Sequence, residues 1–185
     1  MRPRKVQDDV VINGILNVFR THGYDGASLS QLAEGSGLQK ASLYHRFNGG
    51  KKEIALAVLL HIDQGVQKNV HDLLADTSRS PEERLLLVLD NIREVYAGGQ
   101  KTCVLRAMGM DSAASLFGKE IQGTMDKWIQ GFVHLGRAFG FSETKALELA
   151  KKTLVMVQGS LIVSKGIGSF EVFEDALLDL SLIHI

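Results

Sequence analysis

Residues 28–47, SLSQLAEGSGLQKASLYHRF, have the pattern of two short helices joined by a tight turn. Ser28 can cap the first helix by accepting a bond from a backbone N–H, and Gln31 can return a bond to complete a capping box. Ala33 is small where a second helix must cross closely, and Gly37 supplies the positive φ that a sharp turn between helices requires. This spacing predicts a helix-turn-helix motif.

The second helix of this motif has an apolar side and a polar side. Leu38, Leu43 and Phe47 are expected to point inward as anchors. Helical geometry then leaves a set of amide, hydroxyl, phenol, imidazole and cationic side chains facing solvent or a partner. These are Gln39, Lys40, Ser42, Tyr44, His45 and Arg46. Such groups bond phosphate oxygens and base edges, which favours DNA binding. An ordinary helical hairpin with a polar outer face is the alternative interpretation.

The basic residues are concentrated near the N-terminus. Lys51 and Lys52 follow the break Asn48-Gly49-Gly50 and are expected near the start of the next helix, where backbone N–H groups also favour a phosphate. Residues 1–52 contain eight Lys or Arg and four Asp or Glu, a net charge of +4, and the other residues carry −4. A basic end on an acidic remainder fits a protein that presents one end to nucleic acid.

Residues from about Val11 to Leu60 resemble the tetracycline-repressor-like (TetR) transcriptional regulators. The resemblance rests on Phe19, Gly23-Tyr24, the capped second helix, LYHRF at 43–47 and GKKEI at 50–54. It implies that the helix containing Tyr44 enters the major groove, that Tyr44 and Lys51 touch phosphates, and that the C-terminal part binds an inducer and dimerises. Gln39 departs from the family pattern, because many members carry Ser or Thr there as a cap. The expected DNA contacts are Ser28, Gln39, Lys40, Ala41, Ser42, Tyr44, His45, Arg46 and Lys51.

Size and composition indicate a globular protein. The chain has 185 residues, of which 45% are apolar and 23% charged, with 2 Pro, so a proper core can form and long disorder is not expected. The single cysteine, Cys103, excludes an intrachain disulfide and a Cys-rich metal site. Neither a basic-then-apolar leader nor an apolar run near 18 residues is present, so we expect a cytoplasmic protein with no membrane span.

Helical periodicity continues through the chain and predicts an all-α fold. Gly23 is expected to close a helix that starts at Asp8 or Asp9, and a long helix over residues 51–74 carries an apolar stripe ending at Val70 and Leu73. Ser80, Pro81 and Glu83 start a helix to about residue 97. Further helices are expected at 103–110, from 114 or 115 to 139, at 143–165, and after Gly168-Ser169 with a stripe that includes His184. We expect a three-helix head (residues 1–50) and a larger helical domain for ligand binding and dimerisation (residues 51–185). The run Arg2-Pro3-Arg4-Lys5 fits either a frayed terminus or an arm that follows DNA.

The last two helices carry more apolar surface than one monomer core needs. Gly159 and Ser160 would permit close approach of another helix, so pairing with a second copy is expected. The alternative is that both helices simply close the monomer core. The residues predicted at the dimer interface are Leu154, Gly159, Leu161, Ile162, Phe173, Leu177 and Leu180.

Sulfur and aromatic side chains are concentrated in the larger domain. Methionine is adaptable and polarisable, which suits a cavity for an apolar effector. Such residues at helical spacing also fit ordinary core positions. The predicted ligand-binding residues are Cys103, Met108, Phe117, Met125, Trp128, Phe132 and Met156.

No catalytic, metal-binding or cofactor-binding motif is present in the sequence. A metal-binding His-Glu-x-x-His helix, paired cysteines and a Gly-rich dinucleotide fingerprint are all missing, and His61 and His71 are ten residues apart on one predicted helix. We therefore expect no enzyme and no cofactor. The leading hypothesis is a homodimeric, effector-responsive repressor of a palindromic DNA operator. The alternative is a helical interaction module whose basic head binds protein or RNA without reading sequence.

Overall fold

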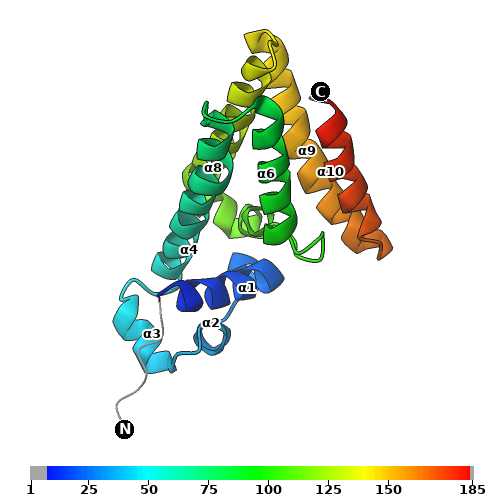
Figure 1. Ribbon diagram of the computed structural model, residues 1–185. Helices are drawn as coiled ribbons and strands as arrows, with labels where there is room; N and C mark the ends of the chain where they lie inside the picture. Colours follow the sequence, from blue (N-terminus) through cyan, green and yellow to red (C-terminus); the bar gives the residue numbers. More distant parts are fainter. Residues whose placement is uncertain (1–7, 184–185) are drawn as a thin grey trace. The chain divides into compact units, whose positions relative to one another are not determined.

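The computed structural model describes residues 8–183, and within that range it contains helices and turns but no β-strand (Figure 1). The all-α fold class is confirmed. The predicted arm Arg2-Pro3-Arg4-Lys5 and His184 lie outside the described residues. The helices are α1 (Asp8–Gly26), α2 (Leu29–Gly35), α3 (Lys40–Arg46), α4 (Gly50–Val66), the π-helical turn η1 (Gln67–His71), α5 (Asp72–Ala75), α6 (Pro81–Val95), α7 (Val104–Met108), α8 (Asp111–Ala138), α9 (Glu143–Ile167) and α10 (Glu171–Ile183).

The described residues form two compact units. The first contains the chain up to Ile62 together with Val104–Ile121, and the second contains Asp63–Cys103 and the residues from Gln122 onward. Helices α4 and α8 therefore each contribute residues to both units. These units are defined by which residues lie close together in space. The predicted boundary between a DNA-binding head (residues 1–50) and a ligand-binding domain (residues 51–185) is a functional division, and it stays a prediction.

Helix α1 departs from helical geometry where the sequence predicts its end. Gly23 has φ 66° and ψ −178°, and a further turn to Gly26 follows this break. A β-carbon at Gly23 would also lie 3.1 Å from the carbonyl oxygen of Ala107 in α7. Before the break, one face of α1 is buried in the core of the first unit through Val11, Ile15, Leu16 and Phe19.

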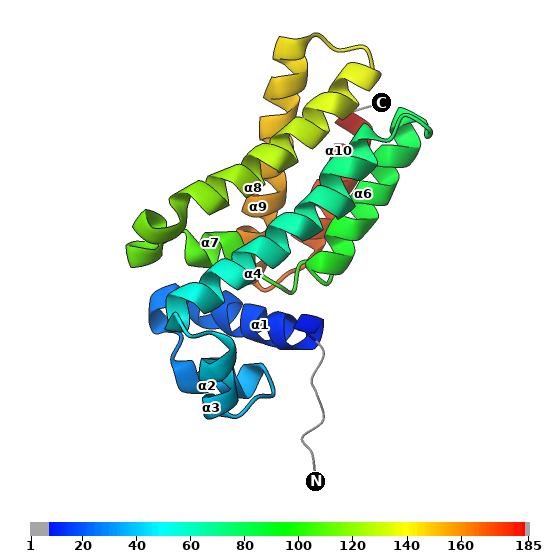
Figure 2. The ribbon, with the colours of Figure 1, turned by 90° about the vertical axis from the view of Figure 1, so that its left-hand side faces the viewer.

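Two glycines let α1 and α2 approach each other closely. A β-carbon on Gly14 of α1 would lie only 1.9 Å from the carbonyl oxygen of Gly35 in α2, and one on Gly35 would lie 2.4 Å from a methyl carbon of Val18. Ala33, the small residue that the sequence places where the second helix of the motif crosses, is buried. The contact between the two helices (Figure 2) therefore depends on glycines that the sequence pattern did not single out.

The predicted long helix over residues 51–74 is present as α4, η1 and α5, but it is not uniform. One π-helical turn contains about one residue more than an α-helical turn, so the buried face moves forward along the sequence. Leu74 is completely buried and Leu73 is half-buried. Leu73 is therefore only partly on the inward side, and Leu74 is the fully buried residue at this end of the stripe.

The helices of the second unit begin and end close to the predicted residues. Ser80 and Glu83 form a capping box, with Pro81 in the first helical turn of α6. Ser142 caps α9, and Gly168, with φ 73°, ends it. Helix α8 begins at Asp111, earlier than predicted. Helices α9 and α10 lie side by side (Figure 1), and α6 also contacts α10.

The close approach of α1 and α2 gives a testable prediction. Gly14→Ala is expected to lower the free energy of unfolding by about 1–3 kcal/mol, because the added methyl group would overlap the Gly35 carbonyl and force the helices apart. Gly65→Ala is the control, since its β-carbon meets nothing within 4 Å in α4. That control is expected to be neutral or to stabilise by roughly 0.5–1 kcal/mol. Denaturant unfolding measures both, and wild-type stability of Gly14→Ala would contradict the close contact.

Candidate nucleic-acid interface

The turn between α2 and α3 is built from local hydrogen bonds. At its N-terminal side, Ser28 caps α2 by accepting from the Gln31 backbone N–H, while the Gln31 side chain accepts from the Ser28 backbone N–H at 2.9 Å. At its C-terminal side, Gly37 has φ 68° and donates to the Glu34 carbonyl, while Leu38 donates to the Ala33 carbonyl at 3.1 Å. This is the Schellman arrangement, which ends a helix sharply. The predicted helix-turn-helix is confirmed.

The buried Ser36 side chain also supports the turn, and the sequence pattern did not identify it. Its hydroxyl donates to the Ala33 carbonyl at 2.7 Å and accepts from the Leu38 backbone N–H at 3.3 Å. A buried hydroxyl is stable only when it is hydrogen-bonded, so Ser36 fixes the path of the chain between the two helices.

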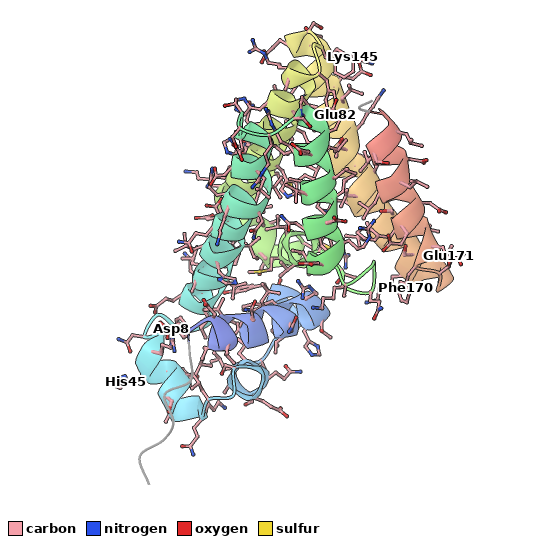
Figure 3. All side chains as sticks on the ribbon, in the orientation of Figure 1. Asp8, His45, Glu82, Lys145, Phe170 and Glu171 are labelled. Carbon is pink, nitrogen blue, oxygen red and sulfur yellow. The ribbon has the colours of Figure 1, made fainter. Side chains whose placement is uncertain are left out.

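Helix α3 is divided into a buried side and an exposed side as the sequence predicts. Leu43 and Phe47 are buried, whereas Leu38 is only half-buried and is a weaker anchor than expected. Figure 3 labels His45 on the outer side of α3. The candidate contacts that lie exposed are Gln39, Lys40, Ala41, Ser42, Tyr44 and His45. Gln39 precedes α3 without making a side-chain capping bond, so its amide remains available to a partner.

Three other candidate residues form bonds with other groups of the protein itself. The Ser28 hydroxyl makes the cap of α2. The Arg46 guanidinium lies 2.5 Å from the Asp8 carboxylate and over the Phe47 ring at 5.8 Å, which ties the end of α3 to the start of α1. The Lys51 ammonium donates to the backbone carbonyls of the α1–α2 connection at 3.2 and 2.9 Å.

Comparison with known proteins finds a family that matches the helix-turn-helix region. Residues 11–58 match the family described as bacterial regulatory proteins, tetR family. The HTH-type transcriptional regulator LmrA of Bacillus subtilis (strain 168) is 22% identical over 158 residues, which cover 83% of this chain and 84% of the relative. The helix-turn-helix region of the chain thus matches this family. The relative is named as a transcriptional regulator with a helix-turn-helix, the motif formed here by α2 and α3.

Solved structures of TetR regulators share the fold along nearly the whole chain. A TetR transcriptional regulator from Legionella pneumophila matches with a TM-score of 0.83 and 17% identity, covering 98% of each chain. A cysteine mutant of the TetR family regulator CifR, complexed with 26bp double-strand operator DNA, matches with a TM-score of 0.72 and 23% identity, covering 95% of this chain and 98% of that one. The all-helical second unit is thus part of a TetR fold.

The predicted dimer residues fall into two groups. Leu161, Phe173, Leu177 and Leu180 are buried within the second unit, so they close its core and leave no side chain for a second copy to contact. This corrects their assignment to the interface. The members of the predicted set that keep exposed or partly exposed positions on α9 are Leu154, Gly159 and Ile162. Exposed apolar residues outside the predicted set are Val155, Val163 and Ile167 on α9, Phe170, and Leu178 and Leu182 on α10.

The predicted effector-binding residues are divided between the two units of the TetR fold. Met108 and Phe117 belong to the first unit and are fully buried, and the Phe117 ring packs edge-on against Tyr24 at 5.0 Å. Within the first unit these two side chains pack in its core. The members in the second unit are Cys103, Met125, Trp128, Phe132 and Met156. Among them, Trp128 and Phe132 stack at 5.3 Å.

Among residues 8–183, none of the helices combines the length and the apolar composition needed to span a membrane.

Proposed function

We propose that the protein is a homodimeric repressor that binds a palindromic operator in double-stranded DNA and releases it when a small, largely apolar effector binds. The observation that carries the DNA-binding part is the exposed face of α3. Lys40, Ser42 and Tyr44 project from a helix whose opposite side is held in the core by Leu43 and Phe47. A regulator of transcription must meet the chromosome, so we propose the cytoplasm as its location.

The exposed side chains of α3 suggest different tasks at the operator. Lys40 and Ser42 lie in the first turn, and their ammonium and hydroxyl groups suit the acceptor edges of bases in the major groove. Tyr44 is 45% exposed, and its phenol can pack on a sugar and bond a phosphate. Gln39 and His45 add an amide and an imidazole to the same surface. We propose Lys40 and Ser42 as the base-reading residues and Tyr44 as a phosphate contact.

Exposed apolar residues on the outer surface of α9 and α10 support the proposal of a dimer. On α9, Val155 is 70% exposed and Ile162 is 55% exposed, and on α10 Leu178 and Leu182 are 60% and 63% exposed. The space around Gly159 is open, since a β-carbon there would meet nothing within 4 Å, so another helix can approach its backbone. Apolar side chains at such exposure favour burial against another surface. A second copy would also double the short DNA site that one α3 reads.

The sulfur and aromatic residues of the second unit support the proposal that it binds an effector. Trp128 and Phe132 are buried and stacked, and Met125 and Met156 are half-buried. Methionine side chains adapt to ligands of different shape at low energetic cost. We propose that this group contacts an apolar effector of low molecular weight. The Gln158 amide, which lies 3.4 Å from the Tyr96 hydroxyl, is a candidate polar contact.

Sequence readout is tested by titrating the protein with labelled duplexes that contain different inverted repeats. We expect one palindrome to be preferred, and Lys40→Ala to reduce discrimination at one base position by about 1–3 kcal/mol. Tyr44→Ala is expected to weaken binding to all duplexes alike. The same affinity for every sequence would favour the alternative, a module that binds nucleic acid or protein without readout. If Lys40→Ala ranked the duplex sequences by affinity in the same order as the wild type, this would contradict a base-reading role for Lys40.

The dimer surface is tested by placing a charge on it. Ile162→Glu is expected to convert the dimer to a monomer and to reduce operator affinity at least tenfold, because a buried unpaired carboxylate costs more than 1.4 kcal/mol. Leu86→Glu on α6 is the matched control, since Leu86 is also 55% exposed and lies outside α9 and α10. Sedimentation analysis of both variants gives the mass. A monomeric wild-type protein, or a dimeric Ile162→Glu, would contradict this surface.

The effector site is tested through Trp128, the single tryptophan of the chain. The apolar dye 8-anilinonaphthalene-1-sulfonate is expected to bind the native protein saturably and to quench Trp128 fluorescence by energy transfer. Phe132→Ala is expected to change the dye affinity, whereas Leu60→Ala, at an exposed position of the first unit, is not. Compounds that displace the dye are then tested for operator release. Non-saturable dye binding, or equal effects of both substitutions, would contradict the proposed site.

A further inference from the structure

The inward side of helix α9 carries three hydroxyl groups. Thr153, Ser160 and Ser164 are all buried within the second unit. Ala146 lies on the same side of α9, and this side meets α8, since a β-carbon on Gly136 of α8 would lie 2.9 Å from the Ala146 β-carbon. About five helical turns separate Ala146 from Ser164, so Ser164 lies in line with Ala146 along the helix. The Ser164 side chain therefore lies on the middle of the face that α9 turns toward the interior.

Two of the three hydroxyls are paired within the helix. The Thr153 hydroxyl donates to the Leu149 carbonyl at 3.0 Å. The Ser160 hydroxyl donates to the Val157 carbonyl, also at 3.0 Å. Carbonyls three or four residues earlier are the usual acceptors for hydroxyls inside a helix. The Ser164 hydroxyl does not form such a bond: it is completely buried and has no hydrogen-bond partner among the residues that the structure describes.

An unpaired hydroxyl at this position destabilises the folded protein. Folding removes the hydroxyl from water, and no bond inside the protein replaces the bonds that are lost. Buried polar groups are paired in nearly all native proteins, so an exception of this kind needs an explanation. A ligand that bonds to Ser164 when it occupies the interior of the second unit would provide one.

The buried polar side chains of the second unit indicate the chemistry of such a ligand. Those that the structure describes are Arg84, Thr102, Thr124, Thr153, Ser160 and Ser164. Of these, only Arg84 is charged, and it lies near the start of α6. Figure 3 labels Glu82 close to Lys145 at one end of the second unit and Phe170, which follows α9, at the other. A charged ligand group beside Ser164 would thus be buried without Arg84 as a partner, which is unfavourable.

We propose that the Ser164 hydroxyl binds an uncharged hydrogen-bonding group on the otherwise apolar effector. A serine hydroxyl can both donate and accept, so alcohols, phenols and ketones are the classes that fit. A pure hydrocarbon of the same size would leave Ser164 unpaired and bind more weakly. This inference rests on the proposed function, because it specifies the chemistry of the proposed effector.

Phenol and toluene test this bond, because they are similar in size and differ in one polar group. Dissociation constants of both are measured by ligand-observed NMR titration. We expect the ratio of phenol affinity to toluene affinity to fall roughly five- to tenfold in Ser164→Ala, as for the loss of one buried hydrogen bond. Ser160→Ala is the matched control. Its ratio is expected to equal that of the wild type, because the Ser160 hydroxyl is already paired with the Val157 carbonyl.

Thermal unfolding without any ligand gives a second measurement. Both serines lie inside α9, so the change to alanine improves helix propensity equally in the two variants. Ser164→Ala also removes an unpaired buried hydroxyl, whereas Ser160→Ala removes a paired one. We therefore expect the midpoint temperature of Ser164→Ala to exceed that of Ser160→Ala by about 2–4 °C.

Three results would overturn the inference. The first is a ratio of phenol to toluene affinity that is the same in Ser164→Ala as in the wild type. The second is the absence of saturable binding by either probe. The third is a midpoint temperature of Ser164→Ala at or below that of Ser160→Ala, which would show that the Ser164 hydroxyl is already paired in the free protein. Failure of the operator and dye experiments would instead overturn the proposed function, and the measurements on Ser164 use neither DNA nor dye.

Discussion

Helix α3 has seven residues and cannot persist in water by itself, because an isolated helix of that length does not recover the cost of forming its first turn. Its exposed face therefore depends on the contacts that hold its other side. Leu43 and Phe47 provide apolar burial, and the Ser36 hydroxyl and the Gly37 turn determine the direction in which the helix leaves α2. Packing on the buried side of α3 therefore holds its polar side in place at the surface.

The local features of this head could be predicted from the sequence because they involve residues three or four positions apart. The capping boxes at Ser28 and Ser80, the glycine turn and the two-sided pattern of α3 are of this kind. Contacts between distant residues gave no such signal. The bond between Asp25 and Ser112 joins residues 87 positions apart, and the approach of Gly14 to Gly35 joins two glycines that have no side chain to form a pattern.

The C-terminal helices show a different limit of sequence patterns. Both α9 and α10 are apolar on more than one side, and the sequence indicated an excess of apolar surface without showing which side faces the core. Phe173 and Leu177 pack inside, while Leu178, the next residue, lies exposed. These residues are all apolar, so their hydrophobicity does not show which of them is buried. Only their position around the helix separates the buried residues from the exposed one. The side of each helix that faces the core is known only once the positions of the neighbouring helices are known. In Figure 3, Phe170 and Glu171 mark the turn between the two helices.

The π-helical turn at Gln67–His71 has a consequence for comparing this chain with its relatives. A π turn is equivalent to the insertion of one residue into a regular helix, which the helix absorbs by widening. A homologue with one residue fewer between positions 66 and 72 would form an unbroken α-helix and bury the residue that corresponds to Leu74. Sequence alignments of such pairs are thus expected to contain a single-position gap inside a helix, where gaps are normally placed in loops.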